Sequence, residues 1–436
     1  MNKLSTKIKH FALSINLTEV AFKMFIKFLV LILPKINREK LIKIGKKKNT
    51  ICIVEEEYEA LIKTPNQSLA KERFINSYGQ KKVDCFFGVK IKDVRLIGPF
   101  GIPFTRKGQV ILEPISKFWL NKVLAITIIQ LGLFGFFKEF LLAIFPIFAS
   151  KKNFLEMGAY LICRGVKYKS IFEKKQSEPV FGHWLGEQLP QLRGIEGIFS
   201  KFNISCPLIV NKNPKDWQIE SLELMGYKKD NIYELTQKGL RVGEIIISSL
   251  RNVHSRQAEF DPKARKWAAK RLQSNFEKLN FEEYNKKNIS LFRQNENNRR
   301  ISNFEDVKKV IFENHYYETK IENQSLFESA KNFYFAKNYL SVYGSGILRI
   351  MFMKQPKKLI EIYTKNISHR DVFFLLASEF GMKYECVAAQ IVQNNNINDN
   401  LNKKGNFEYQ FVNNDWYVPI FELKKSLLEK NNYIKC

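Results

Sequence analysis

The segment FGHWLGEQLP, which runs from Phe181 to Pro190, places a histidine four residues before a glutamate. On a helix this spacing puts both side chains on the same face. An imidazole beside a carboxylate can accept a proton near neutral pH, so His183 and Glu187 are candidates for general base chemistry. The same spacing also occurs in pairs that only form a hydrogen bond on a helix surface, and it does not say which residue would take the proton.

Arginines in the second half of the chain form another candidate site. Arg293 follows the expected strand 289–292, while Arg299 and Arg300 precede a helix that is expected to begin with Ser302 as its cap and Glu305 three residues later. Arginines beside a helix N-terminus can bind a phosphate or a carboxylate. A solvated basic loop is the alternative interpretation.

Two further features follow expected strands in the same region. Gly344, Ser345 and Gly346 come after the strand 339–342 and would let backbone amides approach an anion, although a plain tight turn fits equally well. Glu361 follows the apolar residues 359–360, where a carboxylate can bind ribose hydroxyls or can simply be an exposed strand residue.

Metal chemistry has little support in the sequence. The chain contains no Asp-x-Asp sequence, so diphosphate binding through a metal held by that motif is not supported. Its six cysteines are dispersed without a Cys-x-x-Cys pair, which argues against a zinc ribbon, an iron–sulfur site or a disulfide framework. We expect reduced thiols in the cytosol and no metal or other cofactor.

Strands and helices alternate along most of the chain. The pattern predicts strands in 83–114, at 207–210, 231–235, 242–248, 289–292, 339–342, 358–363 and 384–392, and helices at 216–225, 262–279, 302–313, 325–333, 371–380 and 420–431. Such alternation, occurring twice, predicts an α/β protein with two doubly wound Rossmann-type domains. Ligands are then expected at the carboxyl ends of the strands, in the cleft between the domains.

Charge and hydrophobicity indicate an anionic partner. The net charge is +28, and residues 1–50 form a basic amphipathic arm by prediction. Residues 120–150 form a hydrophobic insert in which Lys138 and Glu139 interrupt the apolar run. A single span would place both charges near the middle of the bilayer, at about 2.5–3.5 kcal/mol each, so we expect an insert that enters a membrane without crossing it. A buried core helix and a true span are the alternatives.

Together these residues resemble glycosyltransferase family 61, also known as the DUF563 group. Residues 183–192 (HWLGEQLPQL) are similar to its His-Trp/Phe-Leu-x-Glu-x-Leu-Pro-x-Leu segment, and the resemblance is clear over 178–392 and weak over 83–118. The family pattern is also matched by Ile289 with Ser290, Arg293, Arg299 or Arg300, Asn303 with Glu305, Gly344 to Gly346, and Ile360 with Glu361. The chain departs from it at Tyr343, where the family commonly has His, at Arg349 in place of Asn, and at Ser329 in place of Gln.

The resemblance implies a GT-B-like enzyme that transfers a sugar with inversion from a nucleotide-sugar to a glycan or lipid-linked acceptor, without an obligatory metal. An acceptor domain would span 51–285 and a nucleotide-binding domain 286–395, followed by a mobile Asn-rich loop and a closing helix at 396–436. His183 and Glu187 would be catalytic. The implied donor-binding residues are Arg293, Arg299, Arg300, Asn303, Tyr343, Gly344, Ser345, Gly346 and Glu361.

Combined with the membrane signals, the resemblance leads us to expect a peripheral or monotopic protein on the cytoplasmic face of the cell membrane, acting in surface polysaccharide or glycoconjugate assembly. Two other functions stay open. A basic protein could bind nucleic acid, although no helix-turn-helix, zinc finger or RNP-like motif supports this. A transferase altered at Tyr343 and Arg349 could also act only as a membrane-bound scaffold.

Overall fold

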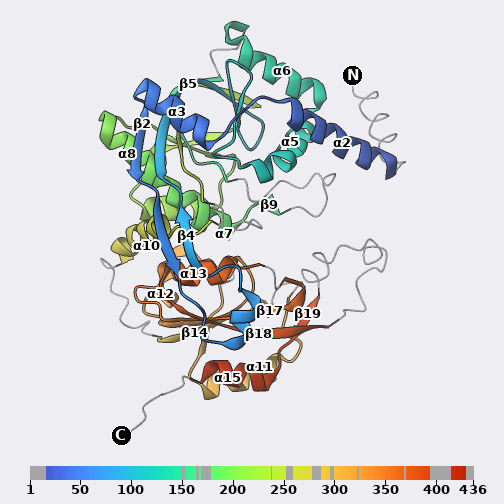
Figure 1. Ribbon diagram of the computed structural model, residues 1–436, viewed down its shortest axis with the longest axis vertical. Coiled ribbons are helices and arrows are strands. Elements are labelled where there is room, and N and C mark those ends of the chain that lie inside the picture. The colour runs from blue at the N-terminus through green and yellow to red at the C-terminus, as the bar shows by residue number, and fades with distance from the viewer. Residues whose placement is uncertain are drawn as a thin grey trace.

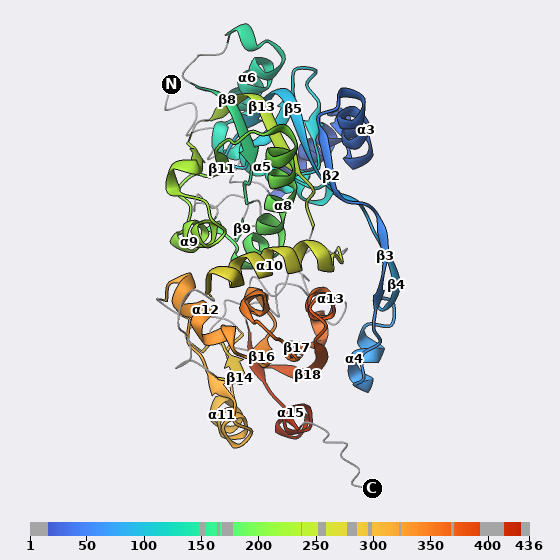
Figure 2. The same cartoon turned by 90° about the vertical axis from the view of Figure 1, so that its left-hand side faces the viewer.

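The protein is built on two large sheets, one in each of two lobes that lie end to end (Figures 1 and 2). The computed structural model describes residues 16–148, 153–163, 166–167, 178–236, 238–251, 259–276, 286–294, 299–321, 324–367, 370–392 and 414–428. The N-terminal lobe holds a nine-stranded sheet, and the C-terminal lobe, which begins at Asn288, holds a six-stranded sheet. The Asn-rich loop expected after residue 395 lies outside the described residues.

The N-terminal sheet is mixed rather than doubly wound. Its order is β1 (Lys35–Ile36), β7 (Val110–Ile111), β6 (Ile102–Thr105), β5 (Phe86–Ile97), β13 (Gly239–Ser248), β8 (Phe154–Tyr160), β11 (Leu208–Asn211) and β12 (Ile232–Leu235), with β2 (Ile51–Glu55) also paired to β5. Within it, β13, β8, β11 and β12 form a parallel run, and β1 also pairs parallel with β7. The expected Rossmann pattern is therefore wrong for the other half, because β5 is one long strand that pairs antiparallel with β13, β6 and β2.

Close helix packing places the HWLGEQLP segment on this sheet. α8 (Leu189–Phe202) follows that segment and crosses β5 where Gly194 meets Gly88. A Cβ atom on Gly88 would lie 2.0 Å from the Gly194 carbonyl oxygen, so neither position has room for a side chain. This contact fixes the height of α8, and of the residues before it, above the sheet.

Part of the expected basic arm belongs to the N-terminal lobe. α2 (Asn16–Ile32) packs on the hydrophobic insert, β1 pairs with β7, and α3 (Arg38–Lys48) buries Leu41 and Gly45. Residues 35–48 thus belong to the lobe rather than to a separate arm, because β1 joins the sheet and α3 packs on it. Residues 1–15 lie outside the described part of the chain.

The hydrophobic insert divides into a buried and an exposed half. α5 (Lys117–Leu131) buries Leu120, Leu124 and Ile126, so this half is the core helix that the sequence left open as an alternative. α6 (Leu133–Ile144) and the 3-10 turn Pro146–Phe148 follow a bend of 109°. No single helix among the described residues is long and apolar enough to cross a membrane, whereas α5 and α6 together meet that criterion by length and composition.

The C-terminal sheet is largely parallel, as expected. Its order is β15 (Tyr317–Glu318), β14 (Asn288–Leu291), β16 (Asn338–Val342), β17 (Lys358–Thr364), β18 (Lys383–Val392) and β19 (Asp415–Tyr417), with only β19 antiparallel. The helices that accompany these strands are α11 (Phe304–Glu313), α12 (Leu326–Tyr334), the 3-10 helix Ser345–Phe352, α13 (Val372–Glu379) and α15 (Ile420–Leu427). The strand order reverses between β14 and β16, and ligands of such sheets bind at that point.

One expected helix cap differs. α11 begins at Phe304 with Asn303 as its N-cap, while the Ser302 hydroxyl donates a hydrogen bond to the Trp416 carbonyl. The serine–glutamate cap is found instead at α12, where Ser325 and Glu328 bond to each other's backbone amides.

A hairpin from the N-terminal lobe clasps the C-terminal lobe. The strands β3 (Tyr58–Ile62) and β4 (Gly79–Val83) run alongside it and carry α4 (Ser68–Arg73) at their tip (Figure 2). Arg73 is buried there, 3.3 Å from Glu361 and 3.1 Å from the Tyr384 hydroxyl, and its guanidinium stacks 3.6 Å from the Tyr363 ring centroid. The Gln67 side chain pairs with both backbone groups of Cys386.

We predict that Arg73→Ala lowers the free energy of unfolding by about 3–5 kcal/mol, because it leaves the buried Glu361 carboxylate without its cation. Chemical denaturation measures this change. Lys82→Ala is the matched control, since Lys82 belongs to an exposed ion pair with Glu57 in the same hairpin. An equal effect of both substitutions would contradict the clasp.

Candidate functional site

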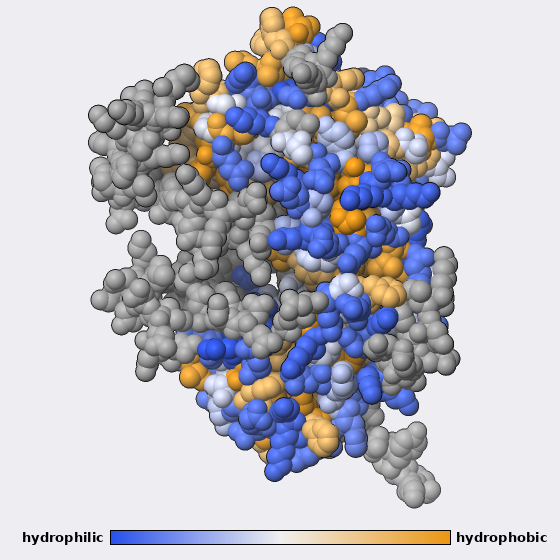
Figure 3. Space-filling model, turned by 180° about the vertical axis from the view of Figure 1, so that it is seen from behind, coloured by the Kyte–Doolittle hydropathy of each residue, from blue (hydrophilic) through white to orange (hydrophobic). Residues whose placement is uncertain are grey.

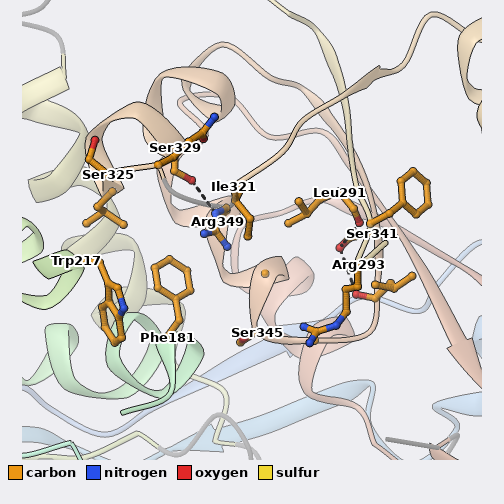
Figure 4. Close-up of a pocket in the computed structure, with 16 residues that line it drawn as sticks. Phe181, Trp217, Leu291, Arg293, Ile321, Ser325, Ser329, Ser341, Ser345 and Arg349 are labelled. Atoms are coloured by element: carbon orange, nitrogen blue, oxygen red, sulfur yellow. Dashed lines mark hydrogen bonds between the residues drawn. The ribbon is translucent and has the colours of Figure 1, made fainter. Parts of the chain in front are cut away.

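A cavity of about 280 Å³ lies between the lobes, at the carboxyl ends of β14 and β16. The N-terminal lobe contributes two aromatic side chains, Phe181 and Trp217, and the C-terminal lobe contributes the rest (Figure 4). Its lining consists of Phe181, Trp217, Leu291, Phe292, Arg293, Ile321, Gln324, Ser325, Leu326, Ser329, Ser341, Val342, Gly344, Ser345, Gly346 and Arg349. The sequence predicted a ligand site at the strand ends, and this cavity lies at that position.

The cavity is basic. Two arginines and no acidic residue are among the described residues that line it. Figure 4 shows Arg349 beside Phe181 and Trp217 at one end, and Arg293 beside Ser341 at the other. A lining of this kind favours an anionic ligand.

The Gly-Ser-Gly turn lies against the arginines that the sequence singled out. Arg299 donates a 2.6 Å hydrogen bond to the Tyr343 carbonyl, and a Cβ atom on Gly344 would lie 3.2 Å from Arg299 and 3.9 Å from Arg293. Arg299 has a φ of 56°, a left-handed conformation that turns the chain at this point. The backbone of the turn therefore lies close to two guanidinium groups, of which Arg293 lines the cavity and Arg299 does not.

Arg349 and Ser329, two of the departures from the family pattern, contact each other. The Arg349 Nε atom donates a 2.8 Å hydrogen bond to the Ser329 hydroxyl, and the guanidinium carbon lies 4.3 Å from the centroid of Phe181. A longer side chain at 349 thus reaches a shorter one at 329. Through Phe181 the same arginine also touches the N-terminal lobe.

His183 and Glu187 form the pair that their spacing predicts. The His183 Nδ1 atom lies 3.0 Å from a Glu187 carboxylate oxygen, and both side chains are buried. The segment is α7 (Phe181–His183) followed by a π-helix at Trp184–Gln188, a distortion that is frequent at functional sites. Trp119 of α5 meets the His183 ring edge-on at 5.6 Å. Neither member of the pair lines the cavity, but Phe181, in the same helical turn as His183, does.

A buried charge network fixes this segment to both lobes. Arg265, in α10 (Pro262–Phe276), donates a 3.0 Å hydrogen bond to the Gly186 carbonyl and forms an ion pair with Glu379 at the end of α13. The Asp261 amide also bonds to Glu379, and Asp261 pairs at 2.6 Å with Arg251. Burial raises the pKa of Glu379 to about 7, an effect that Arg265 and the Asp261 amide oppose.

Several sequence-predicted donor residues lie outside the cavity lining. Arg300 forms a partly exposed ion pair with Asp415, and Asn303 bonds to the backbone of Val418. Tyr343 is buried with its ring 4.9 Å from that of Phe373, and burial raises its pKa.

Glu361 is placed differently from its expected strand end. It lies within β17, which continues to Thr364, and its carboxylate bonds to Arg73 and Tyr384. Burial raises its pKa. A ribose-binding role stays a prediction that this arrangement does not support.

The sequence did not indicate Trp217, Ser325 or Arg265 as parts of the site. Trp217 lies at the start of α9 (Asp216–Leu224), where an apolar residue is typical of the hydrophobic core. Ser325 lies at the start of α12, where a serine is typical of a helix N-cap. For two other lining residues, Arg349 and Ser329, the sequence did carry a signal, because both differ from the family pattern that the chain resembles. Among the described residues, no group of three or more His, Cys, Asp and Glu side chains could hold a metal ion.

Comparison with known proteins gives one family. The family model described as Glycosyltransferase 61 matches residues 181–360, and this confirms the resemblance drawn from the sequence. No curated protein matches the chain. All residues that line the cavity, from Phe181 to Arg349, fall within the matched segment.

The raised pKa of Glu379 predicts a pH dependence of stability. The folded protein keeps the Glu379 proton up to about pH 7, whereas the unfolded chain releases it near 4.5, so this contribution is complete below 4.5 and is lost as the pH rises to about 7. We expect the free energy of unfolding to fall by up to about 3 kcal/mol over this window. Glu379→Gln should remove this fall in denaturation measured at several pH values; an unchanged slope would show that Glu379 stays ionised.

The contact between Arg349 and Ser329 predicts energetic coupling. In a double-mutant cycle of Arg349→Gln and Ser329→Ala, the effects on unfolding should be non-additive by about 1–2 kcal/mol, because either change removes the same charge-assisted hydrogen bond. Denaturant titration of the four proteins measures the coupling. Additive effects would show that the two side chains are independent.

Proposed function

Because residues 181–360 are a family 61 glycosyltransferase segment, we propose that this protein transfers a sugar, with inversion, from a nucleotide-sugar donor to a glycan or lipid-linked acceptor. The observation that carries the proposal is the cavity, whose walls come from both lobes and whose lining falls entirely within the matched segment. Two α/β lobes with a cavity between them support a GT-B-like arrangement in this proposal.

In this proposal the C-terminal side of the cavity binds the donor diphosphate. Arg293 lines the cavity and Arg299 approaches Gly344, so two guanidinium groups lie beside a turn whose backbone can come close to a phosphate. Positive charge fixed at this position stabilises the negative charge that develops on the leaving nucleotide. No step of the proposal requires a metal, and metal independence stays a prediction.

The N-terminal side supplies the base. In a single displacement the acceptor hydroxyl oxygen bonds to the anomeric carbon of the sugar, the bond to the diphosphate breaks, and the hydroxyl proton passes to the enzyme. His183 presents Nδ1 to Glu187, so we assign proton uptake to its Nε2 atom and assign Glu187 to orienting the ring and stabilising its positive charge. The complete burial of Glu187 favours this order over the reverse.

The setting that we propose is the cytoplasmic face of the cell membrane, in surface polysaccharide or glycoconjugate assembly. It is supported by the net charge of +28 and by the apolar insert that packs with α2. Nucleic acid is not a partner in this proposal, because the basic cavity lies between the lobes and takes a small anion rather than a duplex.

Substitutions of the two proposed groups test the function with a panel of nucleotide-sugars. Arg293→Ala should weaken nucleotide binding and lower kcat/KM about 100-fold, because one donor to the developing charge is lost. His183→Ala should lower kcat by about 10²–10⁴ while nucleotide binding persists.

Arg300→Ala is the matched control, since Arg300 is paired with Asp415 outside the cavity. Full turnover by folded His183→Ala and Arg293→Ala proteins would refute the site. Nucleotide binding by a wild-type protein that transfers no sugar to any acceptor would favour the scaffold function instead.

A further inference from the structure

The outward side of α6 and the turn that follows it is an exposed apolar face. Phe134, Ile147 and Phe148 expose 85%, 80% and 74% of their surface. Leu133, Phe137, Leu141 and Phe145 of the same segment are also exposed large apolar residues. Apolar side chains gather at the apex of the N-terminal lobe, which carries this segment (Figure 3). We call Leu133 to Phe148 the apex face. Contiguous exposed apolar residues of this number mark a site of protein or membrane interaction.

The acidic residue of α6 is turned away from this face. Glu139 points into the lobe and bonds to Arg95, which is itself buried. Lys138, the other charged residue of the helix, is exposed. Neither charge therefore opposes contact of the apolar side chains with a membrane. Glu139 is neutralised inside the protein, and the Lys138 side chain can extend to lipid phosphates.

Basic residues also lie beside the apex face. The β6–β7 turn contacts α6, because a Cβ atom on Gly108 would lie 3.2 Å from Phe140, and this turn carries the exposed Arg106 and Lys107. α2 shares a core cluster with α5 and α6 and exposes Met24, Phe28 and Leu31 together with Lys27. Apolar residues with flanking lysines are typical of helices that lie in a membrane interface.

We propose that the apex face docks the protein on an anionic lipid bilayer, with α6 lying in the interface rather than crossing it. The 109° bend between α5 and α6 and the buried pair of Arg95 and Glu139 hold α6 along the surface of the lobe. A lipid surface is favoured over a second copy of the chain, because two copies would bring together basic surfaces of a protein with net charge +28. The proposal rests on the membrane association proposed above and is independent of the chemistry at His183.

Vesicle flotation of the full chain tests the docking. The probe is a vesicle of phosphatidylcholine and phosphatidylglycerol in equal amounts, compared with phosphatidylcholine alone. Wild-type protein should bind the mixed vesicles more tightly, because anionic lipid attracts the flanking lysines. The double variant Phe134→Ser and Phe148→Ser should bind them at least about tenfold more weakly, because two apolar side chains no longer insert.

The matched control is the double variant Phe312→Ser and Phe421→Ser, which removes phenylalanines of similar exposure, 80% and 76%, from α11 and α15 of the C-terminal lobe. It should bind vesicles like the wild type. If the apex double variant does not fold, Ile147→Ser is the substitute, since Ile147 is equally exposed.

Three results would overturn the proposal: no binding of wild-type protein to mixed vesicles, equal binding by the apex variant, or equal loss in the control. A wild-type dimer that the apex variant abolishes, seen by light scattering without vesicle binding, would assign the face to a second copy. Transfer to a water-soluble acceptor separates the two hypotheses, because the apex variant should retain it and a failed transferase proposal would show none in either protein.

Discussion

The relative position of the two lobes depends on the buried contacts of Arg265. Its guanidinium bonds to the Gly186 carbonyl within the π-helix and to Glu379 of the C-terminal lobe, so one buried cation joins the two lobes at the segment that holds His183. Leaving a buried charge without its partner typically costs about 3–5 kcal/mol. The contact between the lobes at Arg265 is therefore rigid. The position of Phe181 against the C-terminal lobe, and with it one wall of the cavity, follows from this joint.

Arg73 forms a second buried contact between the lobes, at a separate position from that of Arg265. It is carried on a hairpin of the N-terminal lobe but satisfies Glu361 inside the C-terminal sheet. Two buried arginines thus connect the lobes at separate points, which restrains rotation about either one. These connections hold the aromatic side chains of one lobe against the arginines of the other at the cavity.

The departures from the family pattern are structurally matched. Arg349 and Ser329, two of the positions that the resemblance singled out, bond to each other at the aromatic end of the cavity. Arg349 therefore adds a positive charge at this end of the cavity, and its side chain is held by Ser329 and by the Phe181 ring.

The sequence by itself determined most strands and helices of the C-terminal lobe, the pairing of His183 with Glu187 and the resemblance of residues 181–360 to the family, because these depend on local periodicity, turn residues and motif spacing. It could not predict which side chains from distant parts of the chain contact one another. Consecutive Arg299 and Arg300 bond to the Tyr343 carbonyl and to Asp415, respectively, because the chain turns at Arg299. Glu361 pairs with Arg73, which lies almost three hundred residues earlier in the chain. Likewise, hydrophobicity marks α5 and α6 equally, and only tertiary packing buries the first and exposes the second.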